Sequence, residues 1–595
     1  MPTELSDAQQ AVLKPEIRLV EACPGAGKTR AIVARYIATA TSRNTAAALL
    51  SFTNAAVDEA ARRCANTPQA TQAPNFMGTF DSFLRRYLLT PVITRQNGKP
   101  PRYVDTWNDL PANVFSTDLR FVGVNGKGLS LAHFHADISG SLHYPADAAD
   151  AAPADDRPYV IELAKAGYMP SDLRELAEAR VGHLTSAGIF DCEQTRLKAL
   201  SVLRESDMTW LHERLAHRFS EIIVDEFQDC SAIEHEILRS LVLLGISVIT
   251  VADPDQAIYE FRQAEPSSYV DYRDALPADQ VVYLDENWRS SPAICALASS
   301  LRSISNRPIV SRRDAAQSPH APTIYVTVGK PKFARAQFIR LANELDVESG
   351  QRLILAATRK AAATLSGRID NASTATTKTG RVIRNVATLR YSGSARERLS
   401  AMSAIEDDLL KLIKIPDDLQ GATREEQLDA AALSKSQLRA MVSRLVDASA
   451  TWTDADTATE SIRVTAKELM ADIELGHKSV KQQFKSAKSA DFKAYAKAAS
   501  VGGPQTEVAG AHIHSVKGGE RDAVMLHIED EPVGARPHIL ALWASGNTHE
   551  ARRVLYVGAS RASRLLVLAV SPQHLDALRA ILKNAGVDAT YLVEN

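Results

Sequence analysis

The stretch EACPGAGKT at residues 21–29 constrains the fold of this chain more than any other. An apolar run over residues 17–22 predicts a strand before it, and apolar residues at helical spacing follow it. A glycine-rich turn between strand and helix binds phosphate, because its backbone N–H groups and the helix N-terminus attract anions. Lys28 would contact the β- and γ-phosphates, and the Thr29 hydroxyl would ligate Mg2+. Ala22 stands where the strict pattern has glycine, and the alternative is an ordinary strand–helix turn.

Length and composition limit the class of protein. At roughly 150 residues per domain, a chain of 595 residues has room for about four domains, or for two large domains with insertions. Lys and Arg (69) nearly balance Asp and Glu (71), so nucleic-acid contacts must come from local patches. The five cysteines are scattered without metal-ligand spacing, and no run is long enough to span a membrane. We therefore predict a cytoplasmic protein with no membrane contact.

A second anchor is EIIVDEFQD at residues 221–229, an apolar strand that ends in two carboxylates. Asp225 would hold Mg2+, and Glu226 would orient and deprotonate an attacking water. The next predicted strand, residues 246–252, leads to Gln256, which is placed to sense the γ-phosphate. Acidic pairs at strand ends are common, but together with the phosphate-binding loop this pair predicts ATP hydrolysis.

Aromatic and hydroxyl residues after predicted strands indicate contact with single-stranded nucleic acid. Phe52 follows the strand at residues 46–50, where it could stack on a base while Thr53 and Asn54 bind phosphates. The alternative for Phe52 is a place in the core. GTFDSF at residues 78–83 repeats the theme, and Tyr259, Phe261 and Arg262 follow Gln256 closely.

Nine motifs in order resemble those of superfamily 1 helicases of the UvrD/Rep/PcrA group. The motifs are LSDAQQ, ACPGAGKT, SFTNAA, GTFDSF, IIVDEFQD, VADPDQAIYEFR, ENWRSS, HIHSVKGGE and RRVLYVGASRA, between residue 5 and about residue 562. The ordered series, and no single motif, carries the resemblance.

The resemblance implies a role for each matching residue. Gln9 and Trp288 would contact adenine, Glu520 the ribose and Arg289 the γ-phosphate, while Arg561 would be the arginine finger. The implied catalytic set is Lys28, Glu226, Gln256, Arg289 and Arg561. The implied ATP-binding set is Gln9, Ala22, Cys23, Pro24, Gly25, Ala26, Gly27, Lys28, Thr29, Arg30, Trp288 and Glu520, with Thr29 and Asp225 on Mg2+. The implied nucleic-acid track is Phe52, Thr53, Asn54, Thr79, Tyr259, Phe261, Arg262 and His514.

Three positions depart from the family pattern. Asp81 stands where a histidine is common, which puts that DNA contact in doubt. Phe261 replaces a frequent tryptophan, and Trp288 replaces a frequent tyrosine. Trp288 should still stack on adenine through its larger face, whereas stacking by Phe261 is expected to be weaker than by tryptophan.

The expected fold is α/β, with two RecA-like P-loop lobes that each carry a largely helical inserted subdomain. Lobe 1 is expected at residues 1–87 and 208–285, with its insertion at 88–207. Lobe 2 is expected at residues 286–372 and 503–595, with its insertion at 373–502. Near the end of the second insertion, Lys478, Lys481, Lys485 and Lys488 recur at helical spacing. They predict either a phosphate-binding face or an ordinary solvated one.

The predicted function is ATP-dependent translocation on single-stranded DNA and unwinding at single-strand/duplex junctions. The resemblance implies 3′ to 5′ polarity, in DNA repair, recombination or defence against foreign DNA. The alternative is a nucleotide- or DNA-sensing helicase-like ATPase subunit that regulates a partner nuclease in an anti-phage system. A partner nuclease or repair protein is compatible with both hypotheses.

Overall fold

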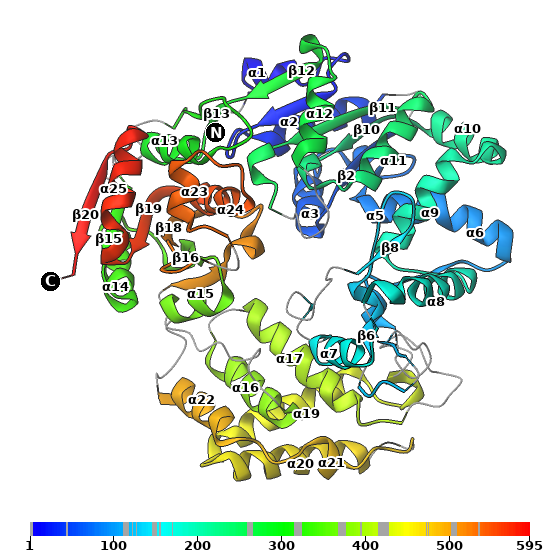
Figure 1. Ribbon diagram of the computed structural model, residues 1–595, viewed down its shortest axis with the longest axis vertical. Helices are drawn as coiled ribbons and strands as arrows, with labels where there is room; N and C mark the ends of the chain where they lie inside the picture. Colours follow the sequence, from blue (N-terminus) through cyan, green and yellow to red (C-terminus); the bar gives the residue numbers. More distant parts are fainter. Residues whose placement is uncertain are drawn as a thin grey trace.

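Two parallel β-sheets organise the computed structural model, with one helix-rich insertion extending from each sheet (Figure 1). The structure describes residues 4–42, 46–110, 118–121, 123–126, 128–144, 152–153, 156–168, 170–258, 266–313, 324–366, 377–392, 395–414, 428–471, 473, 475–500, 508–532 and 536–594. The mixed α/β fold with two parallel sheets confirms the predicted fold class.

The first sheet has the strand order β12-β1-β11-β10-β2-β3, and its strands are parallel. Its strands are β1 (Leu19–Ala22), β2 (Ala46–Ser51), β3 (Phe76–Thr79), β10 (Phe219–Val224), β11 (Ser247–Ala252) and β12 (Val281–Leu284). The central strands are buried along almost their whole length, because helices cover both faces of a parallel sheet. These helices include α1 (Asp7–Ala11), α2 (Lys28–Ala40), α3 (Asn54–Arg63), α5 (Phe80–Leu84), α10 (Thr209–Arg218), α11 (Ala232–Leu243) and α12 (Pro266–Asp274).

The second sheet has the order β17-β16-β18-β19-β15-β20 and is also parallel. Its strands are β15 (Ile324–Val328), β16 (Arg352–Ala356), β17 (Ala509–His512), β18 (Arg521–His527), β19 (Ala562–Val570) and β20 (Ala589–Val593). Its helices include α13 (Pro292–Leu301), α14 (Pro331–Glu344), α15 (Arg359–Ser366), α23 (Ile539–Ala544), α24 (Glu550–Ala559) and α25 (Leu575–Asn584). One hydrophobic core runs from the first sheet into the second, so the two lobes pack directly against each other.

The first insertion leaves lobe 1 after α5 and returns at α10. It contains α6 (Thr90–Asn97), α7 (Arg157–Lys165), α8 (Arg174–Ser186), α9 (Cys192–Arg204) and the paired short strands β4 (Arg102–Tyr103) and β9 (Ile189–Phe190). Trp107, Leu129 and Leu163 are buried in a core that this insertion does not share with either sheet. The exact boundaries of the insertion remain a prediction.

The second insertion is helical and lies opposite lobe 1 in Figure 1. Among the described residues, its helices include α16 (Lys378–Tyr391), α17 (Ala395–Leu410), α19 (Lys435–Ala448), α20 (Ala455–Ala471), α21 (Val480–Gln483) and α22 (Ser489–Ser500). They enclose a separate core that contains Ile383, Leu438, Ile462 and Phe484.

The single helical face predicted for four lysines is wrong. Helix α21 ends at Gln483, so Lys485 and Lys488 lie in the non-helical segment before α22. Phe484 is fully buried in the insertion core and has non-helical backbone angles (φ −104°, ψ 75°). Helix α21 therefore ends at the residue before this buried aromatic ring.

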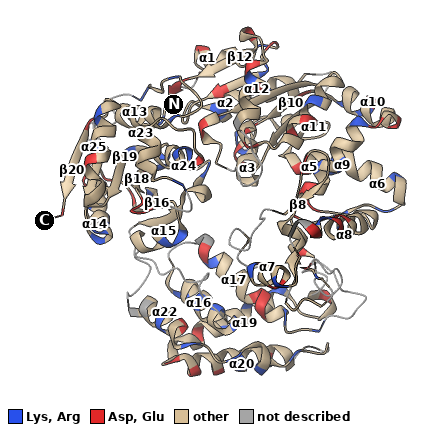
Figure 2. Cartoon of the chain, in the orientation of Figure 1, with Lys and Arg blue, Asp and Glu red and all other residues tan. Residues whose placement is uncertain are grey.

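Charge is distributed without a dominant sign. Figure 2 shows basic and acidic residues interspersed over both lobes and both insertions, as the near-neutral composition predicts. In the part of the chain that the structure describes, no helix combines the length and the apolar character needed to cross a bilayer.

Candidate nucleotide site and nucleic-acid track

The glycine-rich loop connects buried β1 to the first turn of α2. Gly25 (φ +71°) and Gly27 (φ +76°) adopt the left-handed conformation that favours glycine. A Cβ on Gly27 would lie 2.5 Å from Nε2 of Gln9, so the loop also needs glycine for space. Ala22 is the last residue of β1, where it pairs with Leu284, and the strand conformation explains why glycine is not required there.

Two carboxylates that directly follow β10 contact the lysine of this loop. Lys28 Nζ lies 2.5 Å from Glu226 Oε1 and 3.2 Å from Asp225 Oδ1. Glu226 is a non-glycine residue with φ +58°, a strained conformation of the kind that concentrates at functional sites. Gln228 Nε2 donates a hydrogen bond of 2.6 Å to the second carboxylate oxygen of Glu226. The side chain that the sequence predicts as the base is therefore held from two sides.

The two carboxylates differ in pKa. Burial raises the pKa of Asp225, although Lys28 acts against this shift. Burial also acts to raise the pKa of Glu226, but the nearby ammonium groups of Lys28 and Lys517 outweigh it and lower the pKa to about 2. Glu226 is therefore ionised at neutral pH, which is the state that a general base needs.

Gln256 and Arg561 meet where the two lobes join. Gln256 Nε2 donates to Asp253 Oδ2 at 2.8 Å, and its Oε1 accepts from Arg561 at 3.2 Å. Arg561 lies between α24 and β19 and also donates to the carbonyls of Val557 and Gly519. Burial and the charge of Arg289 lower the pKa of Arg561 to about 10, so its guanidinium stays protonated at neutral pH.

The remaining predicted ATP contacts surround the loop. Arg289 Nε lies 2.6 Å from the carboxylate of Glu520, so two predicted ligands bind each other. The backbone N–H of Trp288 donates to the carbonyl of Gly25 at 3.0 Å, which places this aromatic residue against the loop. Gln9 is buried, and its amide donates to the carbonyl of Ala26 at 2.8 Å while accepting from the backbone of Ser6.

These groups fit a Mg2+-bound nucleoside triphosphate. Lys28 lies in the loop, Arg289 borders Gly25, and Arg561 binds Gln256, so cations from both lobes surround the place where a polyphosphate would bind. Thr29 and Asp225 both border one narrow cavity and carry the oxygen ligands that a hard cation prefers, although most of its other lining residues are apolar. Among the described residues, no group of three or more His, Cys, Asp or Glu side chains could hold a metal by itself.

Four of the eight predicted nucleic-acid residues, Phe52, Thr53, Asn54 and Thr79, lie at the carboxyl edge of β2 and β3. Strands β2 and β3 are neighbours with Ser51 opposite Thr79, so the segments that follow them lie side by side. Phe52 is partly exposed and stacks on buried Phe80, with ring centroids 5.6 Å apart and 15° between planes. Thr53 and Thr79 cap the following helices, and Thr53 and Asn54 are exposed. An aromatic face and several hydroxyl and amide groups are therefore presented on one surface.

The other track residues are placed less uniformly. His514 lies in the 3-10 helix η15 (Ile513–Val516), and its ring stacks on that of His512 with centroids 4.6 Å apart. Burial and the neighbouring His512 lower the pKa of His514 to about 4, so the ring is neutral at pH 7. Tyr259, Phe261 and Arg262 lie outside the described residues.

Asp81, the departure from the family pattern, has a specific partner. Arg196 on α9 donates to both of its carboxylate oxygens at 2.9 Å. The same guanidinium lies 3.1 Å from Glu234 on α11. Asp81 thus joins an ion-pair cluster between lobe 1 and the first insertion.

Sequence reasoning missed two residues that hold this site. Asn287 Nδ2 donates to the carbonyl of Pro24 at 2.6 Å, which fixes the loop from the other side. Lys517 contacts the carboxylate of Asp229 and the carbonyl of Gln256. Both lie within matched motifs, ENWRSS and HIHSVKGGE, and that position was the only signal that could have found them.

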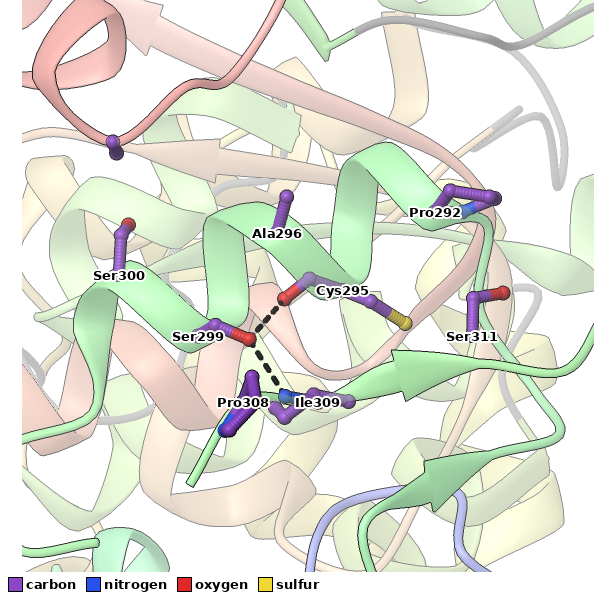
Figure 3. A pocket seen from close by; sticks show the side chains of 9 residues that line it. Pro292, Cys295, Ala296, Ser299, Ser300, Pro308, Ile309 and Ser311 are labelled. Carbon is purple, nitrogen blue, oxygen red and sulfur yellow. Dashed lines mark hydrogen bonds between the residues drawn. The ribbon is translucent and has the colours of Figure 1, made fainter. Parts of the chain in front are cut away.

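A surface cavity of about 560 Å3 lies elsewhere, between α13, the short strand β14 (Val310–Ser311) and the residue after α25. Figure 3 shows Cys295 and Ser299 of α13 with Ile309 beside this cavity, where the Ser299 hydroxyl accepts from the Ile309 backbone. None of the predicted site residues lines it.

Comparison with known proteins agrees with the motif series. Residues 5–277 match the family model described as the UvrD/REP helicase N-terminal domain. The chain is 32% identical to the ATP-dependent DNA helicase Rep of Salmonella typhimurium over 128 residues, which is 22% of this chain and 18% of that relative. It is 25% identical to DNA helicase II of Escherichia coli over 302 residues, 50% of this chain and 40% of the relative. The matches thus span less than half the length of these relatives. They confirm the predicted resemblance to superfamily 1 helicases of UvrD/Rep type.

Proposed function

We propose that this protein is an ATP-driven motor on single-stranded DNA, because residues 5–277 match the family model of the UvrD/REP helicase N-terminal domain. The proposed reaction is hydrolysis of ATP coupled to translocation and to strand separation at single-strand/duplex junctions. The resemblance supports 3′ to 5′ polarity. Repair, recombination or defence against foreign DNA is the proposed setting.

The observation that carries the proposal is the meeting of the two lobes at the phosphate-binding loop. Lys28 and Glu226 come from the first sheet, whereas Arg561 comes from the second and contacts Gln256 of the first. A site that needs side chains from both lobes couples the state of the bound nucleotide to the distance between the lobes. That is the requirement for a motor with a cleft that opens and closes.

Each residue has a proposed part in hydrolysis. When bound, Mg2+–ATP supplies the γ-phosphoryl group that passes to water. Lys28 and Thr29 would bind the phosphates, Thr29 and Asp225 would hold the cation, and Glu226 would take the proton of the attacking water while the bond to the ADP leaving group breaks. Arg561 stabilises the charge that develops in the transition state, a contribution worth about 10³–10⁵ in rate in other phosphoryl-transfer systems. The remaining proposed contacts are Gln256 and Arg289 on the γ-phosphate, Gln9 and Trp288 on adenine, and Glu520 on ribose.

The nucleic-acid surface is proposed at the carboxyl edge of β2 and β3. Phe52 is supported by stacking on Phe80 and keeps an exposed face for a base. Thr53, Asn54 and Thr79 supply hydrogen bonds to the sugar–phosphate backbone. Asp81 is excluded from this set because Arg196 already occupies its carboxylate.

Hydrolysis of ATP by the purified chain, with and without single-stranded DNA, tests the proposal. Stimulation by DNA that Glu226→Gln abolishes, with nucleotide binding retained, is the expected result. Tailed duplexes then test unwinding, and a 3′ tail should support it better than a 5′ tail. If single-stranded DNA does not change the rate of ATP hydrolysis, the proposal of a DNA motor is refuted. That outcome would favour the alternative of a sensing subunit that regulates a partner nuclease.

A further inference from the structure

Lys517 reaches from lobe 2 into lobe 1. It lies between η15 and β18, within the second α/β unit. Its Nζ atom is 2.7 and 2.6 Å from the two carboxylate oxygens of Asp229, and it donates to the main-chain oxygen of Gln256 at 2.8 Å. Only 8% of the side chain is exposed. An ammonium group has three donors, and three acceptors from lobe 1 surround this one.

The acceptors of Lys517 belong to the two loops that carry the proposed chemistry. Asp229 ends the 3-10 helix η7 (Phe227–Asp229), which begins directly after Glu226. Gln256 ends the 3-10 helix η8 (Pro254–Gln256), and its side chain meets Arg561. One ammonium group therefore ties the turn that holds the proposed base to the turn that holds the proposed sensor.

The electrostatic cost of this arrangement argues that it has a purpose beyond packing. Three carboxylates, from Asp225, Glu226 and Asp229, lie close together with little exposure. Lys28 faces the first two, and Lys517 binds the third at 2.6 Å and lies 3.8 Å from Glu226. A buried carboxylate without a partner is strongly unfavourable. Because Lys517 comes from lobe 2, its ammonium group neutralises the Asp229 carboxylate only while the lobes are in contact.

We propose that Lys517 is a positioning residue that makes ATP hydrolysis conditional on contact between the lobes, by holding the Glu226 and Gln256 turns in register. This inference rests on the proposed function of the site. Lys517 does not touch the reacting atoms. It binds the side chain of Asp229, three residues after Glu226, and the main-chain oxygen of Gln256. A displacement of about 1 Å of the groups that these turns carry can cost about 10²-fold in rate.

Steady-state hydrolysis by the full chain with saturating single-stranded DNA tests the proposal. Lys517→Met should lower kcat by about 10²-fold and change KM for ATP by less than about threefold, because the loop that binds phosphate is intact. Lys517→Arg should recover most of kcat, since a guanidinium can bind the Asp229 carboxylate through two donors. Lys332→Met removes an exposed lysine of lobe 2 at the start of α14 and serves as the matched control.

A second measurement separates positioning from general destabilisation. Asp229→Asn should lower kcat alone, and adding Lys517→Met to it should cost little more, because the pair acts as a unit. Binding of a fluorescent ATP analogue should stay within about threefold of the parent in each variant, which also reports on folding.

The outcomes assign failure to one proposal or the other. If the parent chain hydrolyses ATP with DNA but Lys517→Met keeps kcat, the positioning role is refuted and the motor stands. The positioning role is also refuted if Lys517→Met acts mainly by raising KM for ATP, or if Lys517→Arg does not restore kcat. If the parent chain shows no DNA-stimulated hydrolysis, the proposed function fails, and this inference fails with it.

Discussion

The ion-pair cluster around Arg196 predicts a specific loss of stability. Arg196 binds Asp81 through two hydrogen bonds and lies 3.1 Å from Glu234, whose side chain is 2% exposed. Replacing Arg196 with Met leaves that carboxylate buried without its cation. Breaking a buried pair on one side costs about 3–5 kcal/mol. We expect a loss of about 3 kcal/mol, at the low end, because Arg196 and Asp81 are each more than a fifth exposed.

The same two helices offer a matched control. Arg204 on α9 lies 2.6 Å from Glu236 on α11, but its side chain is 51% exposed. An exposed pair of this kind contributes about 0–1 kcal/mol. Urea unfolding of Arg196→Met and Arg204→Met, compared with the parent by midpoint and slope, gives the two losses. Adding Glu234→Gln to Arg196→Met should recover part of the stability, because the unpaired charge is removed.

The loss in Arg196→Met should also depend on pH. Burial already raises the pKa of Glu234 against the effect of Arg196, and removing the cation raises it further. An acid whose pKa is raised in the folded state lowers stability once the pH exceeds its unfolded pKa, and the loss is complete above the folded pKa. The penalty should therefore shrink as the pH falls toward 4.5, the pKa of the unfolded group. Equal losses below about 1 kcal/mol for Arg196→Met and Arg204→Met would refute the argument.

Three further predictions follow from individual side chains. Gly27→Ala should lower the free energy of unfolding in urea more than Gly586→Ala does. Both glycines have positive φ, which costs alanine about 1–2 kcal/mol, but only a Cβ at position 27 would clash with Gln9. Equal losses of stability would contradict this. Phe52→Ala should weaken binding of single-stranded DNA by about 5- to 150-fold, the equivalent of 1–3 kcal/mol for one stacked base, whereas unchanged binding in a fluorescence anisotropy titration would place Phe52 outside the track. Burial, and then Arg239, lower the pKa of His235 from 6.5 to about 4. The free energy of unfolding should therefore fall by about 3 kcal/mol as the pH drops from 6.5 to below 4. His235→Leu should flatten that slope, and an unchanged slope would exclude the histidine as its source.

Local pattern was enough to predict much of the fold. The apolar runs that lead to Ala22, Leu50, Val224 and Ala252 are strands of one parallel sheet, as their burial on both faces requires. The loop between β1 and α2 lies at the position that the glycines predict. Gly25 and Gly27 both have left-handed backbone angles, and Gln9 also lies too close to Gly27 for a side chain there. The prediction of a helical lysine face in the second insertion was wrong, because periodicity alone does not show that Phe484 is buried in the core.

The amino-acid sequence by itself determined the strand–loop–helix unit, the carboxylates that follow β10 and the family to which the ordered motifs point. Each of these depends on residues close together in the chain. Only the tertiary structure decided which partners these residues have. Arg196 takes the carboxylate of Asp81 from 115 positions away, and Lys517 binds Asp229 across 288 positions. Such pairings depend on how the lobes and insertions pack, and no local pattern in the sequence records them.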